Sequence, residues 1–169
     1  MSGKMSKLLL ATNNQGKVHE LESLLEGIPF EIVTPARIGL KLEVAETGST
    51  YEENARLKAT AFARASGLLT LADDSGLEVD ALNGEPGIRS SRYAGEGASD
   101  ADRVQFLLNK LKDVPDEKRT AHFRCVIAIA WPDGRVEFCS GQCDGIITST
   151  PSGSGGFGYD PVFYFPALR

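Results

Sequence analysis

Apolar residues follow two different spacings along this chain of 169 residues, and the spacing changes from segment to segment. Short unbroken apolar runs predict buried strands at 7–11, 30–33 and 68–72. Apolar residues at helical spacing predict helices over 18–27, 50–67 and 99–112. Gly27 and Gly67 are suited to end the first two helices, while Thr50 with Glu53 fits a capping box and Ser99 fits an N-cap. The first half of the chain therefore alternates strand and helix.

The second half has a different pattern. Residues 77–82, LEVDAL, alternate as a half-exposed strand does, and Asn83-Gly84 is a turn. Two long strand patterns, 121–131 and 135–147, flank a Pro-Asp-Gly turn and predict an antiparallel hairpin. Crossover units followed by a hairpin predict one α/β domain with a mixed sheet, and the whole of 1–169 is assigned to it.

Composition and charge narrow the class of partner. The formal net charge of −5 argues against a nucleic-acid or an anionic-membrane partner, but a nucleotide needs only a few local cations. No apolar stretch is long enough for a membrane span. The three cysteines, Cys125, Cys139 and Cys143, lie in or beside apolar runs and predict reduced core thiols rather than zinc ligands, which favours the cytoplasm.

A polar turn joins the first strand to the first helix. Its residues are Thr12, Asn13, Asn14, Gln15, Gly16 and Lys17. A helix start offers unpaired N–H groups and a partial positive charge, and Lys17 adds a full one, so the turn is a candidate phosphate site. It lacks the spaced glycines and Lys-Ser/Thr pair of a P-loop. An ordinary strand-to-helix turn with an exposed lysine fits the same residues.

Two adjacent carboxylates, Asp73 and Asp74, directly follow the apolar run at 68–72 and are expected to close that strand. Neighbouring strand residues point to opposite faces, so at most one of them faces a given site directly. Together with Glu46, which precedes the second helix, such a carboxylate could hold Mg²⁺ beside phosphate oxygens and water. A solvated polar strand end is the other interpretation. Lys58, on the second helix, fits an ordinary solvated lysine.

A glycine-rich segment, SGSGGFGYDP at 152–161, is the third candidate. Its glycines indicate a backbone that turns sharply or lies close to another group. Phe157 could stack on a base, and Asp160 could accept a hydrogen bond from a base or from a neighbouring loop. A glycine-rich connection with Phe157 in the core is the alternative.

Four blocks occur in one order along the chain: LLLATNNQGKVHELESLL, ETGSTYEENARLKA, LADDSGLEVDALNGEPGIRSSRYAG and GSGGFGYDPVF. Together they resemble the inosine triphosphate pyrophosphatase family, also called Ham1-like, from about Lys7 to about Phe163. The resemblance implies an elongated mixed sheet flanked by helices, two lobes with a central cleft, and a homodimer. It also implies Mg²⁺-dependent hydrolysis of ITP, dITP, XTP and dXTP to the monophosphate and pyrophosphate, which removes deaminated purines from the nucleotide pool.

The resemblance also implies roles for individual residues. Thr12 to Lys17 and Lys58 would bind the triphosphate, and Ser75 would touch the substrate. Glu46 and Asp74 would hold Mg²⁺, with Asp74 as general base and Asp73 in support. The base would be contacted by Phe157, Gly158, Tyr159 and Asp160.

The resemblance is incomplete at the C-terminal end. Members of that family continue past the GFGYDP block with a lysine and a Ser-His-Arg motif that reads the 6-oxo group of the purine. These 169 residues contain no Ser-His-Arg, so half of the base-recognition residues are expected to be missing from the domain as given. A Maf-type pyrophosphatase of other base preference and a non-catalytic nucleotide-binding relative are the alternatives. The ADDSGL and GGFGYDP blocks favour the first family over the Maf type.

Overall fold

The computed structural model describes residues 5–167, so both ends of the predicted 1–169 domain lie outside the described residues. The chain forms two compact units. Unit 1 comprises residues 5–74 and 126–140, and unit 2 comprises residues 75–125 and 141–167. Within residues 5–167, no helix combines the length and apolar character that crossing a bilayer requires.

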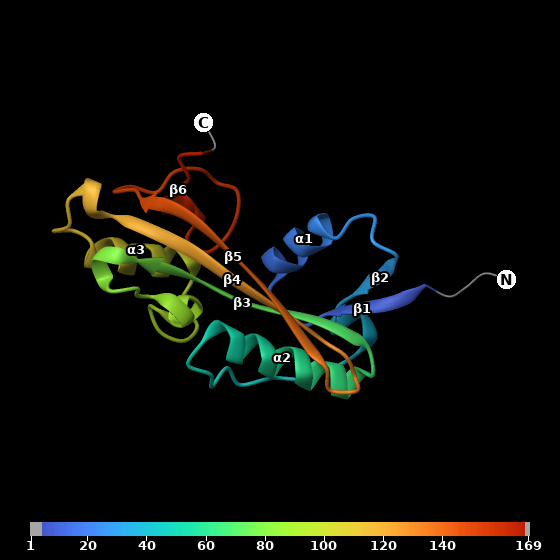
Figure 1. The fold of residues 1–169 in the computed structure, drawn as a ribbon. Coiled ribbons are helices and arrows are strands. Elements are labelled where there is room, and N and C mark those ends of the chain that lie inside the picture. Colours follow the sequence, from blue (N-terminus) through green and yellow to red (C-terminus); the bar gives the residue numbers. More distant parts are fainter. Residues whose placement is uncertain (1–4, 168–169) are drawn as a thin grey trace. The chain divides into compact units, whose positions relative to one another are not determined.

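The strands form one mixed sheet (Figure 1). In chain order the strands and α-helices are β1 (Ser6–Leu10), α1 (Gln15–Leu24), β2 (Phe30–Val33), α2 (Tyr51–Ser66), β3 (Leu69–Val79), α3 (Asp100–Lys110), β4 (Thr120–Ala130), β5 (Val136–Ile147) and β6 (Phe163–Tyr164). The strand order is β2-β1-β3-β4-β5-β6. Strand β1 is parallel to both of its neighbours, whereas β5 and β6 are antiparallel. The predicted α/β class and mixed sheet are confirmed.

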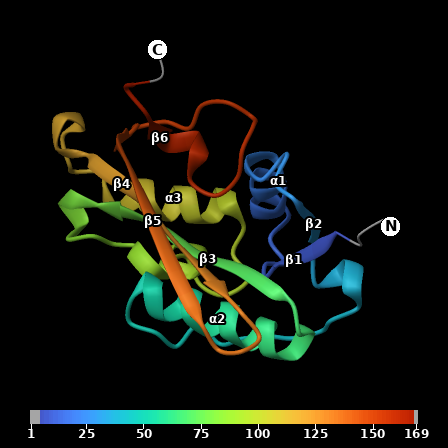
Figure 2. The same ribbon diagram turned by 45° about the vertical axis from the view of Figure 1, so that its right-hand side comes forward.

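Unit 1 places its two helices on opposite faces of β1 and β3 (Figures 1 and 2). From β2 the chain crosses back over β1 to β3, and because both parallel crossovers are right-handed, α1 and α2 cover different faces. Leu8, Leu10, Leu21 and Leu71 form one apolar cluster beneath α1. Helix α2 buries small residues, Ala55, Ala59 and Ala63, completely. Each face of β3 therefore meets a different helix.

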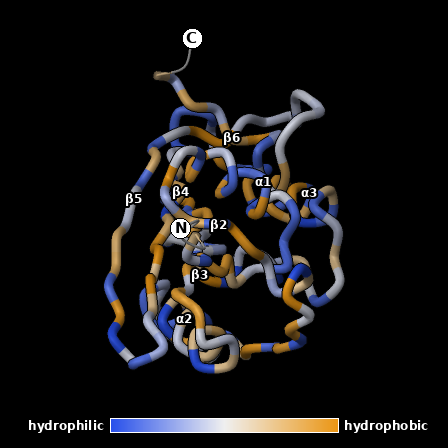
Figure 3. The backbone as a smooth tube through the Cα atoms, turned by 90° about the vertical axis from the view of Figure 1, so that its right-hand side faces the viewer, coloured by the Kyte–Doolittle hydropathy of each residue, from blue (hydrophilic) through white to orange (hydrophobic). Residues whose placement is uncertain are grey.

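Unit 2 is built around α3. Val104, Leu107 and Leu111 pack with residues of β3 and with Tyr159 and Val162 in one buried cluster. Helix α3 begins at a complete capping box between Ser99 and Asp102, as the N-cap prediction expected. Strand β5 is mostly exposed, and its hydropathy changes repeatedly along its length (Figure 3).

The largest error of the sequence prediction is at β3. The prediction ended a strand at residue 72 and began another at 77, but β3 runs without interruption through Asp73 and Asp74 to Val79. Adjacent carboxylates predict a strand end because a buried charge without a partner is unfavourable. Here both carboxylates have partners, so the strand continues. The strand predicted at 77–82 also ends earlier than expected, at Val79, because Asp80–Leu82 is a 3-10 helix.

Three smaller predictions also need correction. Helix α1 begins at Gln15, three residues earlier than predicted, because Asn14 serves as its N-cap, and it ends at Leu24 with Leu25 rather than Gly27 as its C-cap. At α2 the Thr50 hydroxyl accepts from the Glu53 N–H as expected, but the Glu53 carboxylate accepts from Ser49. The cysteines are not the core residues that the sequence predicted: Cys139 is exposed, and Cys125 and Cys143 are half-buried.

Candidate active site

Asp73 and Asp74 are both buried in β3, each about 5% exposed, and they face different helices. The Lys17 ammonium of α1 lies 2.6 Å from Asp73 Oδ2. On the other side, Asn54 Nδ2 of α2 donates to Asp74 Oδ2 at 3.0 Å. The predicted alternation of the two side chains is therefore observed, and each carboxylate is stabilised by its own helix.

The start of α1 is a polar turn, as the sequence predicted, and two of its side chains accept backbone hydrogen bonds. Asn14 Oδ1 accepts from the Lys17 N–H at 3.2 Å, and Thr12 Oγ1 accepts from the Asn14 N–H at 3.1 Å. The first turn of α1 contains no acidic residue, whereas α2 and α3 each have two there. Asn13, Asn14 and Gln15 are exposed. With Lys17 in the same turn, this end of α1 favours a bound anion.

A second lysine and carboxylate pair lies at α2. Lys58 Nζ is 2.6 Å from Glu46 Oε1, and both side chains are largely buried. Asn54 and Lys58 are one helical turn apart and share a face of α2. Lys58 is therefore paired rather than simply solvated, contrary to the ordinary interpretation of its position.

Asn54 connects the segment that carries Glu46 to Asp74. Its side chain is completely buried, and its Oδ1 accepts from the Gly48 N–H at 2.8 Å while its Nδ2 donates to Asp74. Space around Gly48 is tight, because a Cβ atom there would come within 2.7 Å of Asn54 Oδ1. One amide thus fixes both carboxylate-bearing segments of unit 1.

The electrostatic environment raises the pKa of the Asp74 carboxyl. Burial is the main cause, and the nearby Glu46 carboxylate adds to it, while the Asn54 hydrogen bond and the charges of Lys58 and Lys17 oppose it. The influence of Glu46 places the two carboxylates within electrostatic range of each other. A raised pKa suits a group that must accept a proton near neutral pH.

The acidic residues of unit 1 could supply only a small part of the ligand set of a divalent ion. Within residues 5–167, no group of three or more His, Cys, Asp or Glu side chains is arranged to hold a metal. Mg²⁺ commonly takes only one or two protein carboxylates and completes its shell with phosphate oxygens and water. Glu46 and Asp74 meet that smaller requirement.

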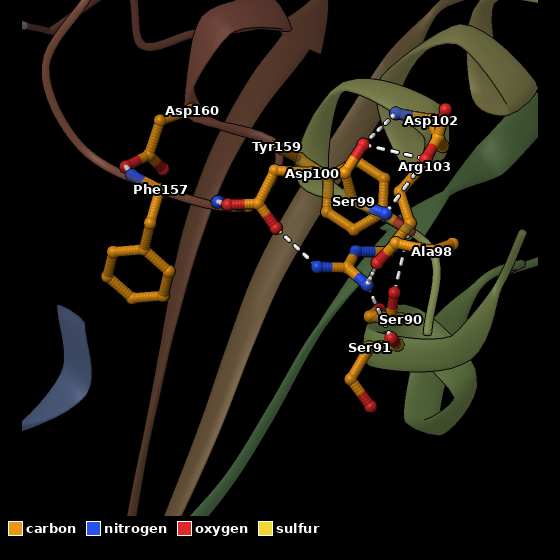
Figure 4. Close-up of polar contacts among 11 residues, drawn as sticks. Ser90, Ser91, Ala98, Ser99, Asp100, Asp102, Arg103, Phe157, Tyr159 and Asp160 are labelled. Atoms are coloured by element: carbon orange, nitrogen blue, oxygen red, sulfur yellow. Dashed lines mark hydrogen bonds and ion pairs between the residues drawn. The ribbon is translucent and has the colours of Figure 1, made fainter. Parts of the chain in front are cut away.

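Unit 2 contains the glycine-rich segment, and side-chain groups hold three of its residues by hydrogen bonds (Figure 4). The Phe157 N–H donates to Asp160 Oδ2 at 2.9 Å, and the Gly158 N–H donates to Asp100 Oδ2 at 2.8 Å. The Tyr159 hydroxyl donates to the Ser90 carbonyl at 2.8 Å. Phe157 is half-buried, and its ring points away from this network, whereas Tyr159 is a core residue.

The sequence prediction missed three residues that hold these groups. Asn54 stands four residues before Lys58, so helical spacing from that lysine could have indicated it. The sequence near Asp100 and Arg103 does not indicate a contact with the glycine-rich segment, because 58 residues separate Asp100 from Gly158. Ser75, at the first position of unit 2, is half-buried in β3.

The fold and the site define an α/β protein with a mixed sheet, in which unit 1 gathers buried carboxylates, two lysines and a helix start without acidic residues. The chain belongs to the Ham1 family, whose model matches residues 8–168.

Named relatives and solved structures agree with this assignment. The dITP/XTP pyrophosphatase of Desulforamulus reducens is 52% identical over 163 residues, which cover 96% of this chain and 81% of that protein. The protein of the same name from Vibrio cholerae is 50% identical over 164 residues, covering 96% and 82%. A HAM1 protein structure from Coxiella burnetii has a TM-score of 0.85 at 42% identity, covering 96% of this chain and 83% of that one. The Staphylococcus aureus Ham1 protein has a TM-score of 0.83 at 44% identity, with the same coverage.

Proposed function

We propose that this chain is a nucleoside triphosphate pyrophosphatase that acts on deaminated purine nucleotides, dITP, ITP and XTP, and releases the monophosphate and pyrophosphate. The observation that carries the proposal is the buried Asp74, held by Asn54 and placed near Glu46, Lys58 and Lys17. Relatives about half identical to the chain bear the name dITP/XTP pyrophosphatase.

Asp74 is proposed as the general base. A water molecule attacks the α-phosphorus while its proton passes to the Asp74 carboxylate, and the bond from that phosphorus to the oxygen bridging to the β-phosphate breaks. Pyrophosphate then leaves with the bonding electron pair. Its fixed hydrogen bond to Asn54 orients the Asp74 carboxylate without reorganisation during the reaction.

Lysines and the end of α1 are proposed to bind the triphosphate. Lys17 and Lys58 are each paired with a carboxylate in the structure, and both ammonium groups can shift part of their interaction to phosphate oxygens. Thr12, Asn13 and the first amides of α1 would add neutral donors. Concentrating these cations lowers the repulsion that a polyanionic substrate presents to an attacking water.

Mg²⁺ is the proposed cofactor, with Glu46 and Asp74 as its protein ligands and Asp73 as a supporting charge. When bound, the ion would neutralise phosphate charge and polarise the phosphoryl oxygens. The base is proposed to contact Phe157, Gly158 and Asp160. Since the Tyr159 ring lies in the core of unit 2, that residue would act through its backbone.

One assay tests the reaction. Pyrophosphate and phosphate released from ITP, XTP, dITP, ATP and GTP are measured with Mg²⁺ and with a chelator. The proposal expects pyrophosphate from the first three, little from ATP and GTP, and none with the chelator. Preference for another nucleotide would favour the Maf type, and binding without turnover would favour a non-catalytic relative. Stepwise phosphate release would exclude the mechanism.

Two finer properties complete the proposal. A homodimer is proposed, and light scattering on the purified chain tests it through the mass in solution. The cytoplasm is the proposed compartment, in keeping with a nucleotide substrate.

A further inference from the structure

The residues from Gly153 to Asp160 include glycines whose backbone conformations other residues rarely adopt. Gly153, Gly156 and Gly158 all have positive φ, and such glycines have the widest conformational freedom of any residue. Gly156 is also crowded, because a Cβ there would lie 2.2 Å from Asp160 Oδ2. The observed shape therefore depends on contacts that hold this segment.

Helix α3 supplies one of those contacts through its first turn (Figure 4). Asp100, the first residue of α3, accepts the Gly158 N–H through Oδ2 and pairs through Oδ1 with Arg103 Nη2. The Arg103 Nη1 donates to the carbonyls of Ser91 at 2.9 Å and Ala98 at 2.6 Å. One guanidinium thus anchors Asp100 to the segments that precede α3.

The contact at Gly158 differs in kind from that at Tyr159. Tyr159 is buried, and its hydroxyl reaches Ser90, whose own hydroxyl donates to the Gly87 carbonyl and accepts from the Leu77 N–H. That anchor belongs to the core of unit 2. Asp100 instead has a side chain about 45% exposed and binds the amide directly after Phe157. Its contribution is to the position of one peptide rather than to the core.

We propose that Asp100, held by Arg103, is a positioning residue that fixes the Phe157–Gly158 peptide for contact with the purine base, so that it controls affinity for the base and not for the phosphates. The proposal rests on the function proposed above, in which this segment contacts the base. Holding a glycine-rich segment in its bound shape lowers the entropy that a ligand must remove, and so increases affinity. Asp100 keeps its carboxylate ionised in this role, because the Gly158 hydrogen bond and the Arg103 guanidinium lower its pKa.

The test compares two products that differ in the base. Binding of IMP and of pyrophosphate is measured by calorimetry with Mg²⁺ for the full chain and for Asp100→Ala. We expect the IMP dissociation constant to rise about tenfold, as loss of a hydrogen bond to a charged group predicts, with pyrophosphate binding unchanged. In turnover of ITP, KM rises and kcat changes little. Arg103→Met should show the same selective loss, because it removes the anchor of Asp100.

Asp102→Ala is the matched control. Asp102 lies in the same first turn and caps α3 through Ser99, so its loss weakens the helix end without removing the bond to Gly158. It should leave both affinities unchanged. Equal IMP binding in the Asp100 and Asp102 variants, or parallel loss of IMP and pyrophosphate, would overturn the proposal, as would a wild-type chain that does not bind IMP. Failure of the proposed function has a different readout, namely no pyrophosphate from any nucleotide with the unaltered chain.

Discussion

Asp74 combines burial with a partial set of compensating groups, and this combination explains both its expected reactivity and its effect on stability. A single amide donor and two lysines within electrostatic range do not fully offset its desolvation, so its pKa is raised. Asp73, one residue earlier, is instead paired directly with an ammonium at 2.6 Å. Two chemically identical neighbours thus have different environments because strand geometry sends them to different helices.

Replacing Asp74 by Asn should abolish most turnover and leave the fold intact. Loss of a general base lowers kcat by about 10²- to 10⁴-fold.

The same variant should change how stability depends on pH. Because the folded chain binds the Asp74 proton more tightly than the unfolded chain does, stability is lost as pH rises above about 4 and through the raised pKa. Asn does not ionise, so the variant should melt at a higher temperature than wild type at pH 8 and at the same temperature near pH 4. Thermal melts at both pH values check the stability, and pyrophosphate release checks the turnover. Near-wild-type turnover would contradict the assignment of Asp74 as the general base.

The Lys17–Asp73 pair should separate stability from catalysis. Lys17→Met removes the counter-charge of a buried carboxylate and should lower the unfolding free energy by on the order of 3 kcal/mol. Adding Asp73→Asn removes the charge that needed compensation, so the double variant should regain most of that loss. Both variants should remain poor enzymes, because the proposed phosphate ligand is absent. Urea unfolding and pyrophosphate release measure the two effects, and recovery of activity in the double variant would contradict the role of Lys17.

At the scale of elements, the sequence predicted most helices and strands well, because their apolar spacing and caps are local properties. The interval FEIV is β2 itself, and Thr50 and Gly67 flank α2 as predicted. The continuity of β3 could not be predicted, since it depends on Lys17 and Asn54, which lie on other elements. For the candidate site, residue types and motifs indicated the carboxylates and lysines. The pairing of Glu46 with Lys58 and the bridging amide of Asn54 required the fold.

Gly48 tests how strongly the Asn54 bridge depends on close packing between elements. A Cβ added there would lie 2.6 Å from Glu53 Cβ and 2.7 Å from Asn54 Oδ1, so Gly48→Ala should displace the amide that holds Asp74. We expect a destabilisation of about 1–3 kcal/mol and a loss in kcat/KM of about tenfold or more. Gly141→Ala is the control, because a Cβ at that glycine meets nothing within 4 Å. Steady-state kinetics and urea unfolding give kcat/KM and the unfolding free energy of both variants. Equal values in the two variants would show that the Asn54 bridge tolerates displacement.

At the scale of the whole molecule, carboxylates and one histidine give stability two opposite dependences on pH. Several carboxyls have pKa values lowered by hydrogen bonds, as at Glu53, Asp102 and Asp133, and they lose their stabilising contribution as pH falls below about 4.5. His122 behaves in the opposite sense. Its Nδ1 is 2.8 Å from Asp144 Oδ1 and its Nε2 is 3.1 Å from Asp80 Oδ1, so these contacts raise its pKa, with Asp144 as the larger cause.

Stability should therefore be greatest between about pH 4.5 and 6.5. The contribution of His122 is fully present below its unfolded pKa of 6.5 and is lost as pH rises through the higher folded value, because the neutral ring no longer pairs with the two carboxylates. Asp74 adds to the same alkaline decline, although its loss begins at lower pH. His122→Gln should lower the melting temperature at pH 6 and leave it nearly unchanged at pH 9, whereas Asp74→Asn raises it at pH 9. Melts from pH 4 to 9 on the three chains separate these contributions, and an alkaline decline that is unaltered in His122→Gln would show that the histidine does not cause it.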